Sequence, residues 1–166
     1  MHVLIASVPH TGSRFTVSLF TKVGFVRHKK PRKNAHSVRL THVRDDDEWR
    51  IVEKHQGPLI VPIRHPLSCA RSYANRDEDV RESWGYWRRL IDQVIPLDPL
   101  LLPIDAADRD GYLEKINSEL GLSLTTDWKK FQSKAPFPRW LTPAEVQGSL
   151  DILKDPFFER FYGSPA

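Results

Sequence analysis

The stretch HVLIASVPHTGSRF, residues 2–15, decides the fold. Residues 2–8 are almost all aliphatic, and such a run predicts a strand that is buried on both faces. A turn-forming segment, residues 9–13, follows directly. Apolar residues then recur at helical spacing up to a stop at Gly24: Phe15, Leu19, Phe20 and Val23. The chain is therefore predicted to open with a strand, a tight loop and a helix.

The same alternation continues along the chain. Further strands are predicted over residues 37–43, 59–63 and 100–104, although Pro62 cannot donate to a sheet ladder. Helices are predicted after the acidic residues 45–48, from Pro66, over 80–94, over 110–120 and from a capping box at Thr142. The tryptophans of the 80–94 helix, Trp84 and Trp87, are predicted to be core. The pattern predicts an α/β fold of three layers, a mostly parallel central sheet of about four to five strands with helices on both faces.

Composition limits the class of protein. With 166 residues, 40% of them hydrophobic, the chain is expected to form a single domain over residues 1–166. The longest apolar run, residues 100–104, is too short for a membrane span, and the N-terminus lacks the basic region of a signal peptide. The single cysteine, Cys69, excludes an internal disulfide framework. We therefore expect a reduced, cytoplasmic domain with no membrane partner.

Charge is unevenly distributed along the sequence. Lys and Arg number 25 against 21 Asp and Glu, which gives a net charge of +4. A basic run at residues 27–33 is followed by an acidic run at 45–48. This balance suits an anionic small ligand, a polyanion or simple solubility. The basic run itself is predicted to be a solvated loop.

Ligands of parallel sheets bind at the carboxyl ends of the strands, so the residues there are the candidates for a site. After the first strand, residues 9–13 lead into a helix whose first N–H groups and dipole would cradle a phosphate or sulfate. Thr11 and Ser13 would add hydroxyls, and His10 and Arg14 would add charge. The alternative is an ordinary helix-capping turn. The loop lacks the lysine of a Walker A sequence.

Two more strand ends carry reactive side chains. His42 follows the second predicted strand, where its imidazole would suit a general base; the alternative is a surface histidine. Arg64 follows the third strand, and Ser72 lies eight residues beyond it in the next helix. A guanidinium and a hydroxyl at this spacing would converge on one phosphate. The alternative is a surface ion pair and a solvated serine.

Taken in this order, the three groups of residues resemble the sulfotransferase superfamily, which uses 3′-phosphoadenosine 5′-phosphosulfate (PAPS) and has a P-loop-like fold. Residues 9–15, PHTGSRF, are similar to the family's Pro-Lys-Ser-Gly-Thr-Thr-Trp loop. Thr41 and His42 resemble the Thr-His tip that carries the family's general base. Arg64, Pro66 and Ser72 match its Arg-x-Pro and the serine eight residues after the arginine. The resemblance covers roughly residues 2–131.

The resemblance implies an enzyme that moves a sulfuryl group from PAPS to a hydroxyl or amine, without a metal. The 5′-phosphosulfate would be bound by the first loop: His10, Thr11, Gly12, Ser13, Arg14 and Phe15. Arg64 and Ser72 would bind the 3′-phosphate, and His42 would take the acceptor's proton. Protonated His10, or Arg14, would supply the cation beside the leaving phosphate. Phe15 would either stack on adenine or join the core.

The chain departs from the family pattern at several points. His10 stands where the family has a lysine, and Leu40 replaces the lysine two positions before the histidine. The family's late Arg-Lys-Gly has no clear match, the candidates being Lys129, Lys130, Lys134 and Arg139. The chain is short between residues 24 and 37, which leaves the crevice open to a small-molecule or glycan acceptor, or to the second subunit of a homodimer. We expect no nucleic-acid partner.

Two other functions fit the same residues. One is a P-loop-type nucleotide or nucleoside kinase with an altered phosphate loop, in which Asp105 is the carboxylate placed to hold magnesium. The other is a non-catalytic module that binds a nucleotide or a polyanion, and the two missing lysines favour it. An ATP-dependent activity that Asp105→Ala abolishes would favour the kinase. Binding without turnover would favour the module.

Overall fold

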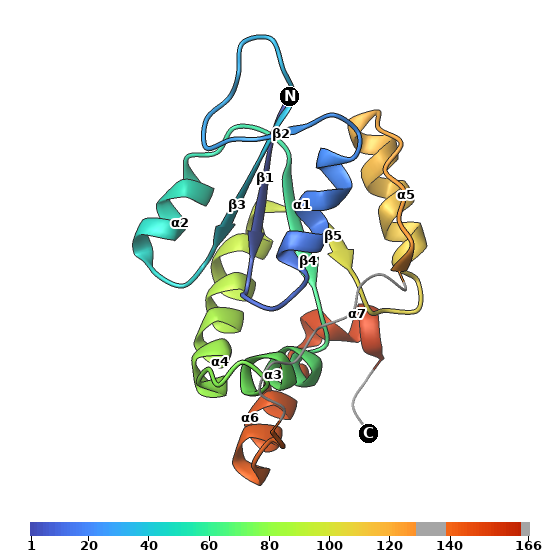
Figure 1. Ribbon diagram of the computed structural model, residues 1–166. Coiled ribbons are helices and arrows are strands. Elements are labelled where there is room, and N and C mark those ends of the chain that lie inside the picture. Colours follow the sequence, from blue (N-terminus) through green and yellow to red (C-terminus); the bar gives the residue numbers. More distant parts are fainter. Residues whose placement is uncertain (129–138, 164–166) are drawn as a thin grey trace.

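A five-stranded sheet forms the centre of the computed structural model, which describes residues 1–128 and 139–163 (Figure 1). All neighbouring strands are parallel, in the order β2-β3-β1-β4-β5. They are β1 (His2–Ser7), β2 (Val26–Arg27), β3 (Ser37–His42), β4 (Leu59–Ile63) and β5 (Leu100–Pro103). The predicted α/β class and parallel sheet are thus confirmed. The prediction that the whole basic run is a loop was wrong at Arg27, because the short edge strand β2 pairs with the start of β3.

Helices cover both faces of this sheet (Figure 1). They are α1 (Ser13–Thr21), α2 (Asp46–Glu53), α3 (Pro66–Ala74), α4 (Val80–Arg89), α5 (Arg109–Leu120), α6 (Pro143–Leu153) and α7 (Glu159–Tyr162). A π-helical segment (Leu90–Val94) and a 3-10 turn (Ile95–Leu97) continue α4. The capping box at Thr142 is present, whereas α7 was not predicted. No helix within the described ranges is long and apolar enough to cross a membrane.

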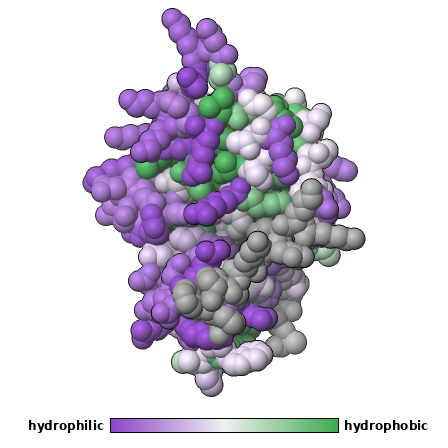
Figure 2. Space-filling view, in the orientation of Figure 1, coloured by the Kyte–Doolittle hydropathy of each residue, from purple (hydrophilic) through white to green (hydrophobic). Residues whose placement is uncertain are grey.

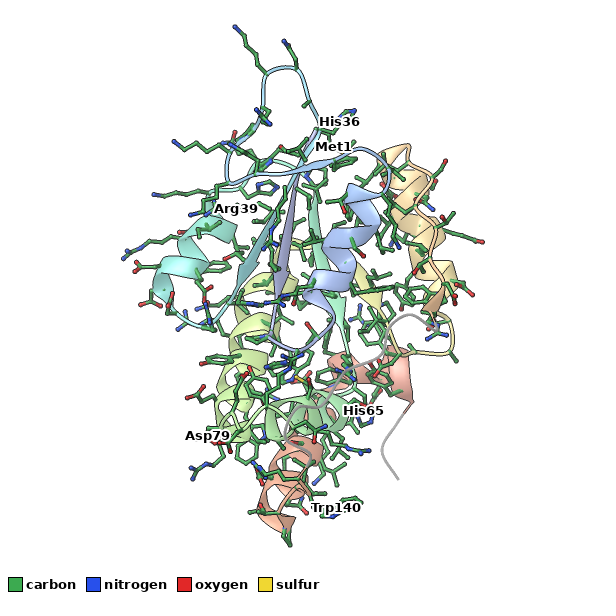
Figure 3. The ribbon with its side chains drawn as sticks, in the orientation of Figure 1. Met1, His36, Arg39, His65, Asp79 and Trp140 are labelled. Carbon is green, nitrogen blue, oxygen red and sulfur yellow. The ribbon has the colours of Figure 1, made fainter. Side chains whose placement is uncertain are left out.

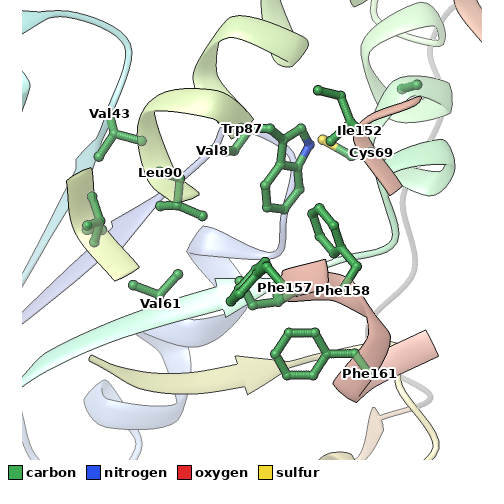
Figure 4. Packing of buried hydrophobic residues seen from close by; sticks show 14 of the residues in the cluster. Val8, Val43, Val61, Cys69, Trp87, Leu90, Ile152, Phe157, Phe158 and Phe161 are labelled. Carbon is green, nitrogen blue, oxygen red and sulfur yellow. The ribbon is translucent and has the colours of Figure 1, made fainter. Parts of the chain in front are cut away.

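Each face of the sheet has its own apolar core. On one face, Ile5 and Leu102 pack with residues of α1 and α5. On the other, Trp87 of α4 packs near Phe158, with a ring separation of 5.2 Å (Figure 4). Trp87 is 1% exposed, and the indole N–H of Trp84 donates to Ser149 of α6. The two tryptophans are therefore structural, as predicted.

The order of the strands reverses between β1 and β4, which are neighbours in the sheet. Pairing between these strands joins only Leu4 and Ile5 to Leu59 and Ile60, so it has ended before Pro62, which cannot donate to a ladder. From β1 the chain builds β2 and β3 on one side, and then β4 and β5 on the other. This reversal makes the β1/β4 gap the topological switch point, where ligands of open α/β sheets bind.

Candidate functional site

The loop between β1 and α1 is shaped to receive an anion. His10 and Gly12 both adopt the left-handed backbone conformation, with φ of 66° and 86°. Turns of this kind direct successive N–H groups toward one side. Gly12 is the N-cap of α1, and no side chain in the described part of the chain caps that helix. The N–H groups of Ser13 and Arg14, at the start of α1, are thus placed to donate to a phosphate or sulfate.

The hydroxyls around this loop differ in their hydrogen bonds. The Thr11 hydroxyl is buried and donates to the Val8 carbonyl at 2.7 Å, so it braces the loop. Thr11 would therefore offer a ligand its N–H and not its hydroxyl. The Thr16 hydroxyl donates to the Gly12 carbonyl at 2.9 Å and secures the start of α1. Ser13 lies at the helix start itself, with its hydroxyl 2.7 Å from that of Ser7.

Arg64 and Ser72 meet at His10, although they come from a strand end and the middle of a helix. The Arg64 guanidinium donates to the His10 carbonyl at 3.2 Å, and the Ser72 hydroxyl lies 3.3 Å from His10 Nδ1. Ser72 is 4% exposed, and burial lowers the pKa of Arg64. A cation that is partly removed from water is stabilised by an anion placed beside it. Arg64 and Ser72 thus contact the same loop residue, while their convergence on one phosphate stays a prediction.

His10 has an acidic partner that the sequence reasoning missed. Its Nε2 lies 2.9 Å from a carboxylate oxygen of Glu78, and its ring stands edge-on to Tyr73 at 4.5 Å. Burial lowers the pKa of His10, and Glu78 opposes that shift. Glu78 belongs to the turn between α3 and α4, just after the left-handed residue Asp77. No local pattern marks a turn glutamate as the partner of a histidine that lies 68 residues away.

His42 is oriented by a chain of hydroxyls. It pairs in register with Ser7 across β1 and β3, and its Nδ1 lies 3.0 Å from the Ser7 hydroxyl. With Nδ1–H donated to Ser7, Nε2 carries the free lone pair of a neutral base. Burial first, and then the charge of Arg44, lower the pKa of His42 and favour this neutral form. Ser7, a second missed residue, connects His42 to Ser13 and so to the anion loop.

The remaining residues of the predicted loop lie at its rim. Arg14 is exposed, and it makes no ion pair with a described carboxylate. Phe15 is half-buried, with its ring 5.6 Å from that of Trp128. The Arg109 guanidinium lies over Trp128 at 4.8 Å. Phe15 thus packs against an aromatic side chain at one edge of the site. This agrees with the alternative in which Phe15 belongs to the core.

Asp105, at the end of β5, is engaged by protein donors. It accepts from the backbone N–H of His65 at 3.0 Å and from the Tyr162 hydroxyl at 2.5 Å. Its negative charge also lies close enough to Arg64 to influence the pKa of that residue. Asp105 therefore fastens α3 and α7 to the sheet beside Arg64.

Neither comparison with known proteins nor the late basic residues identify a further part of the site. No family model, curated protein or solved structure matches the chain. Three of the late candidates, Lys129, Lys130 and Lys134, lie outside the described residues. Arg139 is described, and it forms a two-pronged ion pair with Glu145 at 2.9 Å.

Proposed function

We propose that the protein is a PAPS-dependent sulfotransferase with a P-loop-like fold, acting on a hydroxyl or amine of a small-molecule or glycan acceptor. One observation supports the proposal: residues that follow three separate strands meet at the loop between β1 and α1. Arg64 contacts the His10 carbonyl, Ser72 contacts the His10 ring, and His42 joins the loop through Ser7 and Ser13.

Binding of the donor would divide between two groups of residues. The N–H groups at the start of α1, with the Ser13 hydroxyl, would hold the 5′-phosphosulfate. Arg64 and Ser72 would hold the 3′-phosphate, the guanidinium by paired hydrogen bonds and the serine by its hydroxyl. Phe15, beside Trp128, would offer the adenine an aromatic edge.

In the transfer step, Nε2 of His42 would accept the proton of the acceptor as the acceptor's oxygen or nitrogen bonds to sulfur. The bond between sulfur and the bridging phosphate oxygen breaks, and its electron pair stays on the departing 3′,5′-adenosine bisphosphate. Negative charge therefore grows at that oxygen. The α1 N-terminus and protonated His10 would stabilise it, in a geometry that the loop fixes beforehand.

Calorimetric titration with 3′,5′-adenosine bisphosphate is the direct test, with ATP and 5′-AMP as comparison ligands. We expect the bisphosphate to bind more tightly than either, and Arg64→Ala to raise its Kd at least about tenfold by removing charged hydrogen bonds. Arg88→Ala is the matched control, because it removes an arginine that pairs with Asp155 instead. Absence of binding, or a preference for ATP, would contradict the proposal.

The two alternatives receive unequal support. The kinase would need a carboxylate open to magnesium, whereas Asp105 already accepts from His65 and Tyr162. The non-catalytic module has one specific observation in its favour: burial lowers the pKa of His10, so this substitute for a lysine is mainly neutral near pH 7 before a ligand binds. Transfer of the sulfuryl group from PAPS to a panel of acceptors, measured beside binding, separates the module from the enzyme.

A further inference from the structure

A second cationic site lies at the opposite end of the sheet from the candidate active site. There a hollow of about 310 Å³ opens between α2 and the amino ends of β1 and β3. It is lined by His2, Leu4, Arg39, Arg50, Ile51, Lys54 and His55, so no carboxylate is among its lining residues. Figure 3 places Arg39 beside α2 and His65 at the other end of the molecule.

Arg39 occupies a position in β3 where an apolar side chain would be expected. Its neighbours Val38 and Leu40 pack into the core on the α1 face, so Arg39 faces α2 together with Leu4 and Ile51. Its guanidinium is fixed there by donating to the Lys29 carbonyl at 3.0 Å. The charge is thus held at the hollow and does not extend freely into solvent.

Two imidazoles form a fixed wall of the hollow. His2 Nδ1 lies 2.6 Å from the Ser37 hydroxyl, and His55 Nε2 donates to the Pro58 carbonyl at 3.0 Å. The two rings meet edge-on at 5.7 Å. Gly57 permits this packing, since a Cβ there would stand 2.5 Å from the His2 carbonyl and 3.0 Å from the His55 ring. With Leu4 and Ile51, these rings give the hollow an aromatic and apolar lining against which a base can pack.

The basic loop continues the hollow's positive charge. From Arg27 to Arg39 the sequence contains Lys and Arg at positions 27, 29, 30, 32, 33 and 39 and no Asp or Glu. The side chains of residues 27–36 are all exposed, and Figure 2 shows them projecting as a hydrophilic crown at the top of the molecule. The hydrogen bond that Arg39 donates to the Lys29 carbonyl connects this loop to the hollow. Among the charged lining residues, Arg50 pairs with exposed Asp47 at 3.0 Å. Lys54 forms no ion pair with a described carboxylate.

We propose that the hollow binds a nucleotide unit, a phosphate ester that bears a planar base. Arg39 and Lys54 hold the phosphate, and the base lies against His2, His55 and the apolar floor. The unit belongs either to a free nucleotide or to a single-stranded nucleic acid whose following phosphates run along the basic loop. The nucleic-acid form of this proposal differs from the expectation of no nucleic-acid partner, and the binding test below decides between them. The inference is independent of the proposed sulfotransferase activity.

The test compares a fluorescent single strand of about eight nucleotides with 5′-AMP, inorganic phosphate and heparin. We expect Arg39→Gln to raise the Kd of the nucleotide ligands about tenfold, and Lys54→Gln, on an exposed helix end, to raise it severalfold. Lys115→Gln on α5 is the matched control and should change nothing. Arg64→Ala should also leave this binding intact, which separates it from the first site.

The competing ligands identify the source of the nucleotide. Nucleic acid is identified as the ligand if the single strand binds more tightly than 5′-AMP. In that case the slope of log K against log salt concentration should become smaller by about one in Lys54→Gln. Comparable affinity of 5′-AMP, lost in Arg39→Gln, identifies a free nucleotide. Equal binding by Arg39→Gln and the control, or tighter binding of heparin or inorganic phosphate than of either nucleotide ligand, would overturn the proposal.

Discussion

His10 combines a left-handed backbone, a half-buried ring and two polar partners in one residue. Its left-handed φ of 66° is uncommon for a residue with a side chain, and such outliers concentrate at functional sites. Glu78 on one side and Ser72 on the other fix the ring at both nitrogens. The chemistry of the site therefore depends on whether this ring carries a proton.

The pH dependence of sulfuryl transfer tests the role of His10. Protonated His10 is lost as pH rises through its pKa, so activity should decline on the alkaline side, whereas activity should rise with pH through the pKa of His42, the base. His10→Lys should abolish the alkaline decline, because a lysine stays charged to about pH 10. Glu78→Gln should move the decline to lower pH, because the carboxylate that raises the pKa of His10 is gone. A wild-type profile that is flat from about pH 6 to 8.5 would remove His10 from this role.

Ser7 is expected to contribute to catalysis by positioning His42. Ser7→Ala removes the hydroxyl that fixes the His42 tautomer, so kcat should fall about tenfold, the effect of losing one hydrogen bond of about 1.4 kcal/mol. Binding of 3′,5′-adenosine bisphosphate should remain within about twofold of wild type. Ser83→Ala controls for loss of a buried serine, since Ser83 donates to Val80 inside α4. Equal kcat in Ser7→Ala and wild type would show that Ser7 does not position the base.

Among the helices, α6 secures the elements behind the site. It packs against α3, which carries Ser72, and against α4. The Thr142 capping box begins it, and Arg139 holds the pKa of Glu145 down to about 2. Close approach to α4 depends on Gly148, where a Cβ would stand 2.2 Å from the Trp84 ring.

Gly148→Ala should therefore destabilise the protein, by about 1–3 kcal/mol from overpacking against Trp84. Gly85→Ala is the matched control in α4. Nothing lies within 4 Å of a Cβ at that position, and alanine should stabilise the helix there by about 0.5–1 kcal/mol. Urea unfolding of both variants measures the difference. Stabilisation of similar size in both would show that α6 and Trp84 are not in close contact.

The whole molecule places several half-buried histidines along its sheet. Burial is the largest cause that lowers the pKa of each: His2, His10, His42, His55 and His65. The folded state therefore holds these rings neutral at a pH where the unfolded chain already protonates them. Unfolding takes up protons in this range, so stability rises with pH.

The free energy of unfolding should accordingly be at its full value above about pH 6.5 and should decline as pH falls below it. A second loss should begin below about pH 4.5, where the unfolded chain protonates carboxylates that the folded state keeps ionised, such as Glu145 with its pKa of about 2. Urea titrations at successive pH values measure both stages. Replacing His55 with Gln should reduce the first loss, because burial lowers the pKa of this imidazole. Stability that stays constant between about pH 7 and 5 would contradict the prediction.

The sequence by itself determined the elements of this protein, because the signals for them are local. The aliphatic run before Pro9 specified β1, Gly12 permitted the left-handed turn, and the Thr142 capping box began α6. The alternation of strands and helices was enough to predict a parallel sheet, and the rule that ligands bind at strand ends then selected His10, His42 and Arg64. The helix predicted over residues 80–94 extends that far, but its π-helical form from Leu90 to Val94 was not predicted, and neither was the short helix α7.

Only the tertiary structure decided which side chains meet. Glu78 reaches His10 across 68 residues, Ser7 reaches His42 across 35, and Tyr162 reaches Asp105 across 57. The cationic hollow likewise gathers Arg39, Lys54 and the two histidines from β1, β3 and the end of α2. Such contacts arise from strand order and helix packing, which bring distant residues together without any periodicity in the chain. The partners that set protonation and orientation are therefore visible only in the folded molecule.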